Sequence, residues 1–571
     1  MVNINDLGKV YNSDLLVIGG GIAGLVTAIK AKECNEDLDV LVVDKGTVGW
    51  SGQGSKAGNG IVASAKDQPI EKFAEFIIED NGDYLNDQEF LLDYYSTNLS
   101  AVEQLAGWGV RVSKNPDGSI KIFRQPNNLW GTVGIELFNC QSLRKHALKI
   151  GVRLLSRVQV FELLTKDGRV VGGIGFDLDH MKCQIFHAKA VAVATHGAHF
   201  KKMGGFFMAY GNGLGAAYRA GAQMRNAEFA TEADVVYSAT YNPVYRGHMI
   251  VHNKDGVNIS NIYSPNAAEV RFELFLGMLK EVREGRGPLY VDLRNPDPLR
   301  SLDEPSAHVN NQRFYPDKLD WTDYVKAKSK KFGRPVTDTP EVTAKFMLHA
   351  ECLKVDREWR TSVEGLWAPG KISAMGSAYF GFVRGDGLGF ALQSGLRAAV
   401  SMAKYTAATE LADLDVEQIK TLKDKIYAPL NRKTTRKPSE IFAIIEDMAY
   451  HVDKMLARSE KSMLGVLDEV EEMHKIVPEL TADDAHTLAK CHEAADCALA
   501  LEMIYRAGLM RTESRGGRYR HYRLDYPERD DKNWMKWINI KQGKNGEMEL
   551  FTEDIPMERY PYKPKGWVSS N

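Results

Sequence analysis

The chain opens on an apolar run, a glycine-rich turn and a helical pattern. Residues 15–18 are all apolar, the turn after them has the spacing G-x-G-x-x-G, and small and apolar residues then recur as far as Ala28. A second apolar run ends at Asp44. Strand, glycine turn, helix and second strand in this order are typical of a βαβ unit that binds a dinucleotide. We therefore predict such a unit at the start of the chain.

Each glycine of this turn has a predicted role. Gly19 permits the tight turn, Gly21 lets a pyrophosphate approach the backbone, and Gly24 lets the helix pack closely on the strand. The helix N-terminus offers unpaired N–H groups and partial positive charge to a phosphate. Asp44, about 20 residues further on, suits a ribose hydroxyl.

A second cluster of small residues runs from 46 to 63. So many small residues close to the phosphate turn indicate backbone that lies against a flat ligand. A flexible surface loop is the alternative interpretation, which the apolar residues 61–63 argue against. In and beside this cluster the candidate cofactor-binding residues are Lys45, Ser51, Gly52, Gly58, Asn59 and Gly60.

Later patterns extend the nucleotide-binding domain with segments that are far apart in the chain. Residues 152–176 predict two strands joined by a turn at 166–168, and residues 188–195 predict a buried strand. Residues 364–371 predict a short strand, and a glycine turn at 385–389 opens a helix. Further candidate cofactor-binding residues at the ends of these elements are Ala194, Thr195, Gly370, Gly387 and Leu388.

The remaining patterns predict a cap and a helical region. Residues 230–350 are more polar, with strands expected near 249–259 and a helix near 271–285. Apolar residues recur at helical spacing from about 415 to 507. We predict an α/β fold: a Rossmann-like domain built from separated segments, an inserted α+β capping domain and a C-terminal helical domain.

Composition narrows the class of partner. A net charge of −2 and a pI near 6.7 give no global attraction to nucleic acid or to anionic membranes. The N-terminus has no apolar signal core, and no run reaches the roughly 18 apolar residues that cross a bilayer. We expect a cytoplasmic chain that does not itself span a membrane.

The six cysteines are scattered and form no C-x-x-C pair. This pattern argues against a disulfide framework and against an iron–sulfur cluster bound by this chain alone. Cys491, His492 and Cys497 together resemble a fragment of a metal site, but on a helical pattern we interpret them as packing residues. We predict no metal site.

Taken in order, these blocks resemble the flavoprotein subunit of the fumarate reductase and succinate dehydrogenase superfamily, which includes aspartate oxidase and the alpha subunit of adenylylsulfate reductase. The blocks are VIGGGIAGLVTA, SGQGSKAGNGI, AKAVAVATHGA, GNGLGAAYRAGA, VYRGHMIVHNKDG, GRGPLYVDLR, GLWAPGK and RTESRGGRYRHYRLDYPERDDKNW. The resemblance implies FAD, a mobile cap and a docked helical domain. It also implies that the helix opening at Gly387 to Gly389 aims its positive end at the flavin pyrimidine. The implied boundaries are 1–235 and 351–410 for the two parts of the FAD-binding domain, 236–350 for the cap, 411–510 for the helical domain and 511–571 for the C-terminal segment.

Several positions depart from the family pattern. Where respiratory enzymes tether FAD through a histidine, this chain has Trp50 and Ser51, so we predict non-covalent FAD. Lys371 follows Gly370 where relatives usually carry an acidic residue, and Asn212 replaces the usual aspartate. The contacts to the cofactor are therefore expected to differ in detail.

The resemblance also implies catalytic residues. Arg246 is similar to the family's proton donor, Arg384 to the arginine that grips a substrate carboxylate, and His349 is a candidate near the flavin, with a satisfied core histidine as its alternative. In such a mechanism the flavin N5 delivers hydride to a polarised double bond. Arginine has a pKa above 12, so its role as an acid rests on the resemblance alone.

Two dicarboxylate-binding histidines of fumarate reductases are missing, because Ala233 and Phe380 fall at their positions. Tyr379, Phe382 and Val383 make the same region apolar. The small anionic substrate is therefore expected to be an enoate larger and more apolar than fumarate.

The sequence leaves several functions open. The first is a reductase subunit that receives electrons from a separate iron–sulfur or cytochrome subunit. The second is an adenylylsulfate-reductase-like enzyme, whose anion or acidic partner would meet the basic residues at 518–523, unless these form a solvated stretch paired with nearby acids. An oxidase that uses O2 and a flavin-binding module without catalysis are further alternatives, and an oligomer is compatible with all of them.

Overall fold

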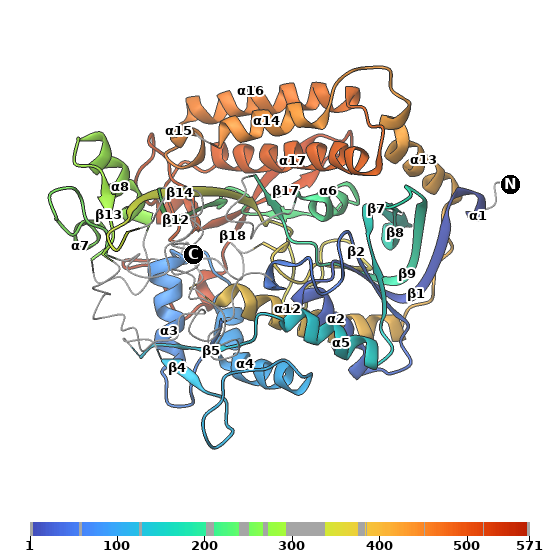
Figure 1. Ribbon diagram of the computed structural model, residues 1–571, viewed down its shortest axis with the longest axis horizontal. Helices are drawn as coiled ribbons and strands as arrows, with labels where there is room; N and C mark the ends of the chain where they lie inside the picture. Colours follow the sequence, from blue (N-terminus) through green and yellow to red (C-terminus); the bar gives the residue numbers. More distant parts are fainter. Residues whose placement is uncertain are drawn as a thin grey trace.

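The computed structural model describes residues 4–55, 60–124, 128–200, 210–238, 250–265, 272–292, 330, 337–374, 383, 385–449, 451–517 and 519–567. Its central feature is a seven-stranded sheet with a helical layer on each side (Figure 1). The sheet follows the order β6 (Arg153–Ser156), β2 (Val40–Asp44), β1 (Lys9–Ile18), β9 (Cys183–Val193), β8 (Arg169–Asp177) and β7 (Val158–Lys166), with β15 (Leu366–Trp367) paired to β9.

The sheet combines a parallel core with an antiparallel hairpin. β1 pairs in parallel with β2 and β9, and β2 pairs in parallel with β6, as a Rossmann-like unit requires. The predicted hairpin is present: Lys166 of β7 faces Arg169 of β8, and Asp167 and Gly168 both have positive φ. Two successive residues with positive φ make the type I′ turn that suits the twist of a hairpin.

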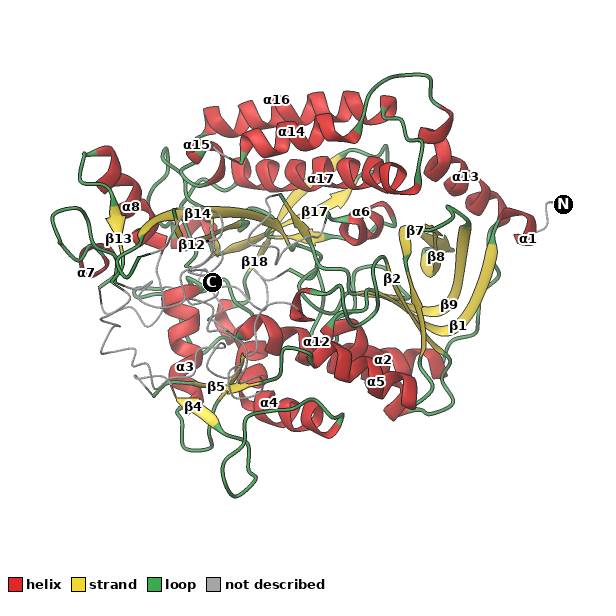
Figure 2. Ribbon diagram, viewed as in Figure 1, coloured by secondary structure: helices red, strands yellow, loops and turns green. Residues whose placement is uncertain are grey.

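Helices cover both faces of this sheet (Figure 2). The layer below it in this view contains α2 (Ile22–Cys34), α5 (Asn139–Lys149) and α12 (Asp386–Ala407). Beside them lie α3 (Ile70–Phe76) and α4 (Gln88–Gly107), next to the small sheet of β3 (Gly60–Ala63), β5 (Gly131–Gly134) and β4 (Ile122–Arg124). The layer above contains α6 (Asn212–Arg219), α13 (Val416–Tyr427), α14 (Pro438–Met448), α15 (Val452–Met455), α16 (Glu460–Ile476) and α17 (Ala485–Met510). The apolar spacing predicted this helical region, and its helices share a core with the outer face of the sheet.

A second sheet forms the base of the expected cap. Its strands are β10 (Ala198–His199), β14 (Glu341–Ala350), β12 (Thr231–Tyr237), β16 (Tyr519–Arg520) and β13 (Leu289–Tyr290). The helices α7 (Ser260–Tyr263) and α8 (Phe272–Arg283) lie at its outer end, where Leu274, Phe275 and Met278 pack on Val235 and Tyr237 in a separate small core. This mixture of helices and strands fits the predicted α+β character.

One predicted cap element is wrong. The strands expected near 249–259 are absent from the described part, residues 250–259, where His252 makes only isolated bridges to Asn258 and Tyr290. The side chain of Asn253 accepts hydrogen bonds from the N–H groups of Asp255 and Val257, 3.1 and 3.0 Å away. A side-chain turn therefore takes the place of a strand ladder.

The C-terminal segment returns to the N-terminal half of the chain. The strand β17 (Lys536–Gln542) pairs with β11 (Met224–Arg225) on one side and with β18 (Met548–Asp554) on the other. The tail then reaches α4, where the amide of Gln88 exchanges hydrogen bonds with the backbone of Tyr562 at 2.8 and 3.0 Å. Tyr560 is buried in the core that contains α3, α4 and α12, so this tail straps the FAD-binding half and not the helical region. None of the helices among the described residues is both long and apolar enough to cross a membrane.

Candidate functional site

The glycine turn has the close backbone contacts that the sequence predicted. Gly19 has a φ of 115°, and a Cβ atom on it would lie 2.4 Å from the carbonyl oxygen of Ala194, at the end of β9. A Cβ atom on Gly24 would lie 1.9 Å from the carbonyl oxygen of Gly19. Gly21 is the N-cap of α2 and supplies no side-chain cap. The first N–H groups of α2 are thus left for an anionic ligand.

Asp44 ties the turn to the loop after β2. Its carboxylate accepts hydrogen bonds from the N–H groups of Gly20 and Gly46 and from the hydroxyl of Ser51, each at 2.7 Å. A Cβ atom on Gly52 would lie 2.8 Å from the Cα of Gly21, so this loop runs against the start of α2. Asp44 therefore fixes both walls of the predicted nucleotide site, and Ser51 acts through Asp44.

A second uncapped helix begins beside the first. Gly385, with a φ of 98°, is the N-cap of α12 and supplies no side-chain cap. A Cβ atom on Gly54 would lie 2.5 Å from Ile22 of α2 and 3.4 Å from Leu388 of α12, so both first turns meet at this glycine. A Cβ atom on Gly387 would meet nothing within 4 Å. The structure therefore places the starts of two helices side by side, with open space at Gly387 and the buried carboxylate of Asp386 in the first turn of α12.

Gly60 and Gly370 complete this cradle. A Cβ atom on Gly385 would lie 3.3 Å from the carbonyl oxygen of Gly60, at the start of β3. The N–H of Gly370 donates to the hydroxyl of Ser394 at 2.9 Å, and a Cβ atom on Gly370 would lie 2.8 Å from Ala23. Sequence reasoning missed Ser394, which lies inside α12 and carries no local signal.

These features fit an extended flavin dinucleotide. One helix end suits the pyrophosphate, and the other suits the flavin pyrimidine, where negative charge collects on reduction. Side chains are absent along the path between them, at Gly21, Gly52 and Gly387. The glycines at 21, 52 and 387 thus line one cradle, and their contacts with FAD stay a prediction.

Two predicted residues point elsewhere. Lys45 directs its ammonium to Glu493 of α17, 3.2 Å away. Thr195 packs against α6, because a Cβ atom on Gly213 would lie 2.0 Å from its hydroxyl. Gly58, Asn59, Arg246 and Arg384 lie outside the described residues, as do Tyr379, Phe380 and Phe382.

The structure gives a reason for asparagine at 212. Its amide N–H donates to Asp496 of α17 at 2.7 Å, and its amide oxygen accepts from Gln159 at 2.5 Å. Asp496 already supplies a buried carboxylate that pairs with Arg219 at 2.6 Å. A second carboxylate at 212 would face the first, so the amide avoids a buried repulsion.

His349 lies in a buried polar cluster. Its Nε2 is 3.3 Å from a carboxylate oxygen of Glu232, on the neighbouring strand β12. Burial opposes its charge, but the carboxylates of Glu232 and Glu351 raise the pKa of His349 above its ordinary value overall. His349 is therefore a buried histidine between two acids, and its place near the flavin stays a prediction.

Sequence reasoning missed most of the other members of this cluster, which are His199, Glu351 and the ammonium of Lys371. His196 also belongs to this cluster. Their one local signal is the pair of histidines in ATHGAH.

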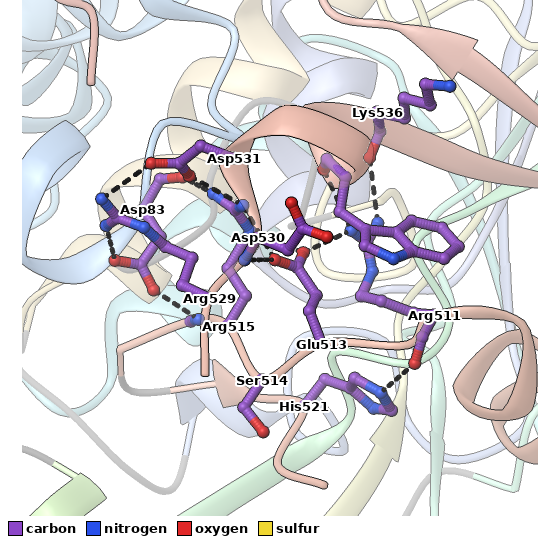
Figure 3. A network of polar contacts seen from close by, with 12 residues as sticks. Asp83, Arg511, Glu513, Ser514, Arg515, His521, Arg529, Asp530, Asp531 and Lys536 are labelled. Carbon is purple, nitrogen blue, oxygen red and sulfur yellow. Dashed lines mark hydrogen bonds and ion pairs between the residues drawn. The ribbon is translucent and has the colours of Figure 1, made fainter. Parts of the chain in front are cut away.

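The C-terminal arginines are buried and paired. Glu513 accepts from Arg511 at 2.9 Å and from Arg515 at 2.7 and 2.9 Å, and all three side chains are fully buried (Figure 3). Arg515 continues to Asp531 at 2.9 Å, and Arg529 joins Asp531 to Asp83 of the N-terminal half.

The basic residues at 518–523 were expected to be either an anion site or a solvated stretch. Arg523 and His521 are buried, and Arg523 pairs with Asp525 at 2.6 Å. Arg520 pairs with Glu273 at 3.0 Å, and Arg518 is not among the described residues. The predicted pairing with a nearby acid is thus present for Arg523, but Arg523 and His521 are buried in the folded interior and are not solvated.

Cys491, His492 and Cys497 lie on α17, and both cysteines are buried. His492 directs its Nε2 to the carbonyl oxygen of Ile426 at 2.8 Å, and Cys497 directs its thiol to the carbonyl oxygen of Tyr210. These contacts agree with a packing role.

Comparison with known protein families matches two models. The model described as FAD binding domain matches residues 14–466, and the model described as Fumarate reductase flavoprotein C-term matches residues 448–567. Among curated proteins, the fumarate reductase flavoprotein subunit of Mycobacterium tuberculosis is 24% identical, over 96% of this chain and 98% of that protein.

Solved structures share the fold. Quinol fumarate reductase FrdA of E. coli, solved as a mutant, has a TM-score of 0.83 at 19% identity and covers 98% of this chain and 99% of its own. Adenylylsulfate reductase of Archaeoglobus fulgidus has a TM-score of 0.77 at 19% identity and covers 96% of each chain. These comparisons confirm the resemblance and the fold class that the sequence predicted.

Proposed function

Because this chain belongs to the FAD binding domain family and carries the fumarate reductase flavoprotein C-terminal region, we propose that it is the catalytic subunit of an enoate reductase. Family membership makes it an FAD-dependent oxidoreductase. The proposal adds the acceptor, an activated double bond conjugated to a carboxylate, and the source of electrons, a separate iron–sulfur or cytochrome subunit.

The observation that carries this proposal is the pair of uncapped helix ends at Gly21 and Gly385, which meet at Gly54. FAD, when bound, supplies hydride from its N5 atom. The start of α12 stabilises negative charge beside it, which favours the reduced state that a reductase must hold. No residue equivalent to a tethering histidine is present at Trp50 or Ser51, so we propose non-covalent binding.

The proposed roles of the catalytic residues come from the sequence. Arg384 binds and polarises the substrate carboxylate, and Arg246 supplies the proton to the substrate carbon. Val383 and Gly385, the neighbours of Arg384, lie at the start of α12, and this location supports a role beside the cofactor. His349 is proposed to hold a proton at its imidazole, supported by Glu232.

The cap supports an acceptor more apolar than fumarate. Ala233 lies buried on β12 within the small core of the cap, where a histidine would have been a polar ligand. Val383 is also fully buried. We therefore propose an aryl- or alkyl-substituted acrylate, gripped at its carboxylate.

Two observations bear on the remaining alternatives. The relative from Mycobacterium tuberculosis is named as the flavoprotein subunit of its enzyme, which supports a separate electron-transfer partner. Arg520 and Arg523 are engaged with Glu273 and Asp525, so neither supplies a free anion site for the sulfur-acting alternative.

Steady-state assays with reduced methyl viologen as electron donor test the proposal. We expect the purified protein to oxidise the dye with an aryl acrylate faster than with fumarate. Arg384→Ala and Arg246→Ala should each lower this rate by about 100-fold or more. Arg506→Ala, at a half-exposed arginine on α17, is the matched control and should stay within about twofold of wild type.

Two outcomes would refute the proposal. The first is that no enoate causes the protein to oxidise the dye. The second is that Arg384→Ala and Arg246→Ala oxidise the dye as fast as the control variant. Acid precipitation provides a separate check on the cofactor: a yellow supernatant is expected, whereas flavin that stays with the pellet would contradict non-covalent binding.

A further inference from the structure

Two histidines and a glutamate converge where the two sheets of the protein meet. His196 and His199 follow the end of β9, and β10 places His199 directly opposite His349 of β14. Glu351 comes just after β14, so the fold brings it back beside both histidines of the ATHGAH sequence. This cluster adjoins the glycine cradle, because Nε2 of His196 lies 2.8 Å from the side chain of Gln53, between Gly52 and Gly54.

The donor atoms have the separations of a metal site. The Oε1 atom of Glu351 is 3.5 Å from Nδ1 of His196 and 3.6 Å from Nε2 of His199. All three ligand atoms lie within 4.8 Å of one another. Both separations from Glu351 exceed an ordinary hydrogen bond, and an ion with bonds of about 2.1 Å in tetrahedral geometry would separate its ligands by about 3.4 Å.

A hydrogen bond on the outer side of His196 orients its ring toward the site. Its Nε2 lies 2.8 Å from the amide oxygen of Gln53, so Nε2 carries the proton. Its Nδ1, which faces Glu351, also lies 3.0 Å from the N–H of Gly197, so an ion bound at this nitrogen would replace that hydrogen bond. An outer hydrogen bond that orients the ring and fixes its tautomer is the usual support of a metal-ligating histidine.

We propose that His196, His199 and Glu351 form a binding site for one divalent first-row transition ion, the class that includes Zn²⁺ and Fe²⁺. Two imidazoles and one carboxylate suit these ions and leave open coordination positions. The side chains are 18, 3 and 4% exposed, so an ion here would be enclosed by protein. No family model or relative described above assigns a metal to these residues.

The ammonium of Lys371 lies beside the proposed metal ligand Glu351. It lies 3.6 Å from the same Oε1 atom of Glu351, so it competes with a cation for that carboxylate. The lysine stem is flexible, and the ammonium would move away as the ion enters. Removal of this charge should therefore tighten metal binding.

The test is metal content. The flavin-loaded protein is stripped with a chelator, dialysed against buffered Zn²⁺ and analysed by atomic emission, with flavin content and far-ultraviolet circular dichroism as checks on folding. We expect about one Zn²⁺ per chain. His199→Gln and Glu351→Gln should each retain less than about one tenth of this amount. His451→Gln, at a half-exposed histidine far along the chain, should retain it all.

Lys371→Met distinguishes this site from any other. Its affinity for Zn²⁺ should rise by about tenfold or more, because a repelling charge is removed. Wild-type protein that retains no zinc, retention equal to wild type in both ligand variants, or weaker binding by Lys371→Met would each overturn the proposal. The zinc count does not depend on turnover, so it is independent of the enoate reaction.

Discussion

At the scale of the residue, single buried acids hold distant segments together. Glu513 is the clearest case, because two buried guanidinium groups, those of Arg511 and Arg515, both depend on its carboxylate (Figure 3). Asp44 does the same for the nucleotide turn, with three donors at 2.7 Å. In both cases the acid positions its neighbours, and the loss of one carboxylate affects more than one segment.

Glu513→Gln should destabilise the protein strongly. The amide keeps the shape but removes the carboxylate that both buried arginines share, which leaves Arg511 with Glu228 alone and Arg515 with Asp531 alone, a change that costs about 3 kcal/mol. Thermal unfolding followed by circular dichroism should show a clear fall in the midpoint. Glu528→Gln, at an exposed side chain nearby, is the control and should unfold like wild type. Equal midpoints for the two variants would contradict the role given to the network.

His492 should contribute to acid sensitivity. Burial lowers the pKa of His492 to about 4, from about 6.5 in an unfolded chain. Between pH 4 and pH 6.5 the histidine is protonated in the unfolded state but neutral in the folded state. Its full contribution to the free energy of unfolding is therefore present above pH 6.5 and is lost as the pH falls toward 4. At pH 5 this group should cost about 2 kcal/mol of the free energy of unfolding.

The test is the difference in unfolding midpoint between pH 7 and pH 5. His492→Gln, which can still donate to the carbonyl of Ile426, should show a smaller difference than wild type. His451→Gln, with a side chain 50% exposed, should behave like wild type. A wild-type-sized difference in His492→Gln would show that this histidine does not titrate as described.

At the scale of the element, glycines set how closely α2 and α12 approach. A Cβ atom on Gly395 of α12 would lie 2.8 Å from the carbonyl oxygen of Ala23 and 2.9 Å from Val26. Gly370 makes a similar approach to Ala23. The two helix ends of the flavin site are held together by these contacts.

Gly395→Ala should therefore separate the helices, lower stability by about 1–3 kcal/mol and weaken FAD binding. Gly465→Ala on α16 is the matched control: its Cβ would meet nothing within 4 Å, and it should be stabilising by about 0.5–1 kcal/mol. Thermal unfolding and FAD retention on gel filtration measure both effects. If Gly395→Ala retains FAD and unfolds like wild type, the close approach of Gly395 to Ala23 is not needed for either property.

Local patterns predicted local structure well. The hairpin at 166–169 depends on two adjacent residues with positive φ, and β2 ends at Asp44 as its apolar run does. The strands expected near 249–259 failed because the side chain of Asn253 bonds to the backbone, a competition that periodicity does not register.

Contacts between residues far apart in the chain could not be predicted from the sequence. Lys45 meets Glu493 across 448 residues, and Gly516 donates to Asp83 across 433. Glu351 likewise reaches the histidines of ATHGAH only through the pairing of β10 with β14. The glycine cradle was predictable because each glycine is required by its own turn, whereas the buried charge clusters arise from the fold.

At the scale of the whole molecule, a Rossmann-like sheet, a cap and a helical layer pack together around the predicted flavin site (Figure 1). The C-terminal segment is tied to the N-terminal half of the chain at two places: Arg529 bonds to Asp83, and the tail bonds to Gln88. The predicted domain boundaries at 235, 350, 410 and 510 stay predictions.

The most direct test of the enoate-reductase assignment is anaerobic reoxidation of the bound flavin. The yellow protein is reduced with dithionite, mixed with an aryl acrylate, and followed by the return of flavin absorbance. We predict rapid return with the acrylate, slower return with fumarate, and loss of the reaction in Arg384→Ala. No return with any enoate, together with bleaching of the oxidised flavin by sulfite, would contradict this assignment and favour the sulfur-acting alternative.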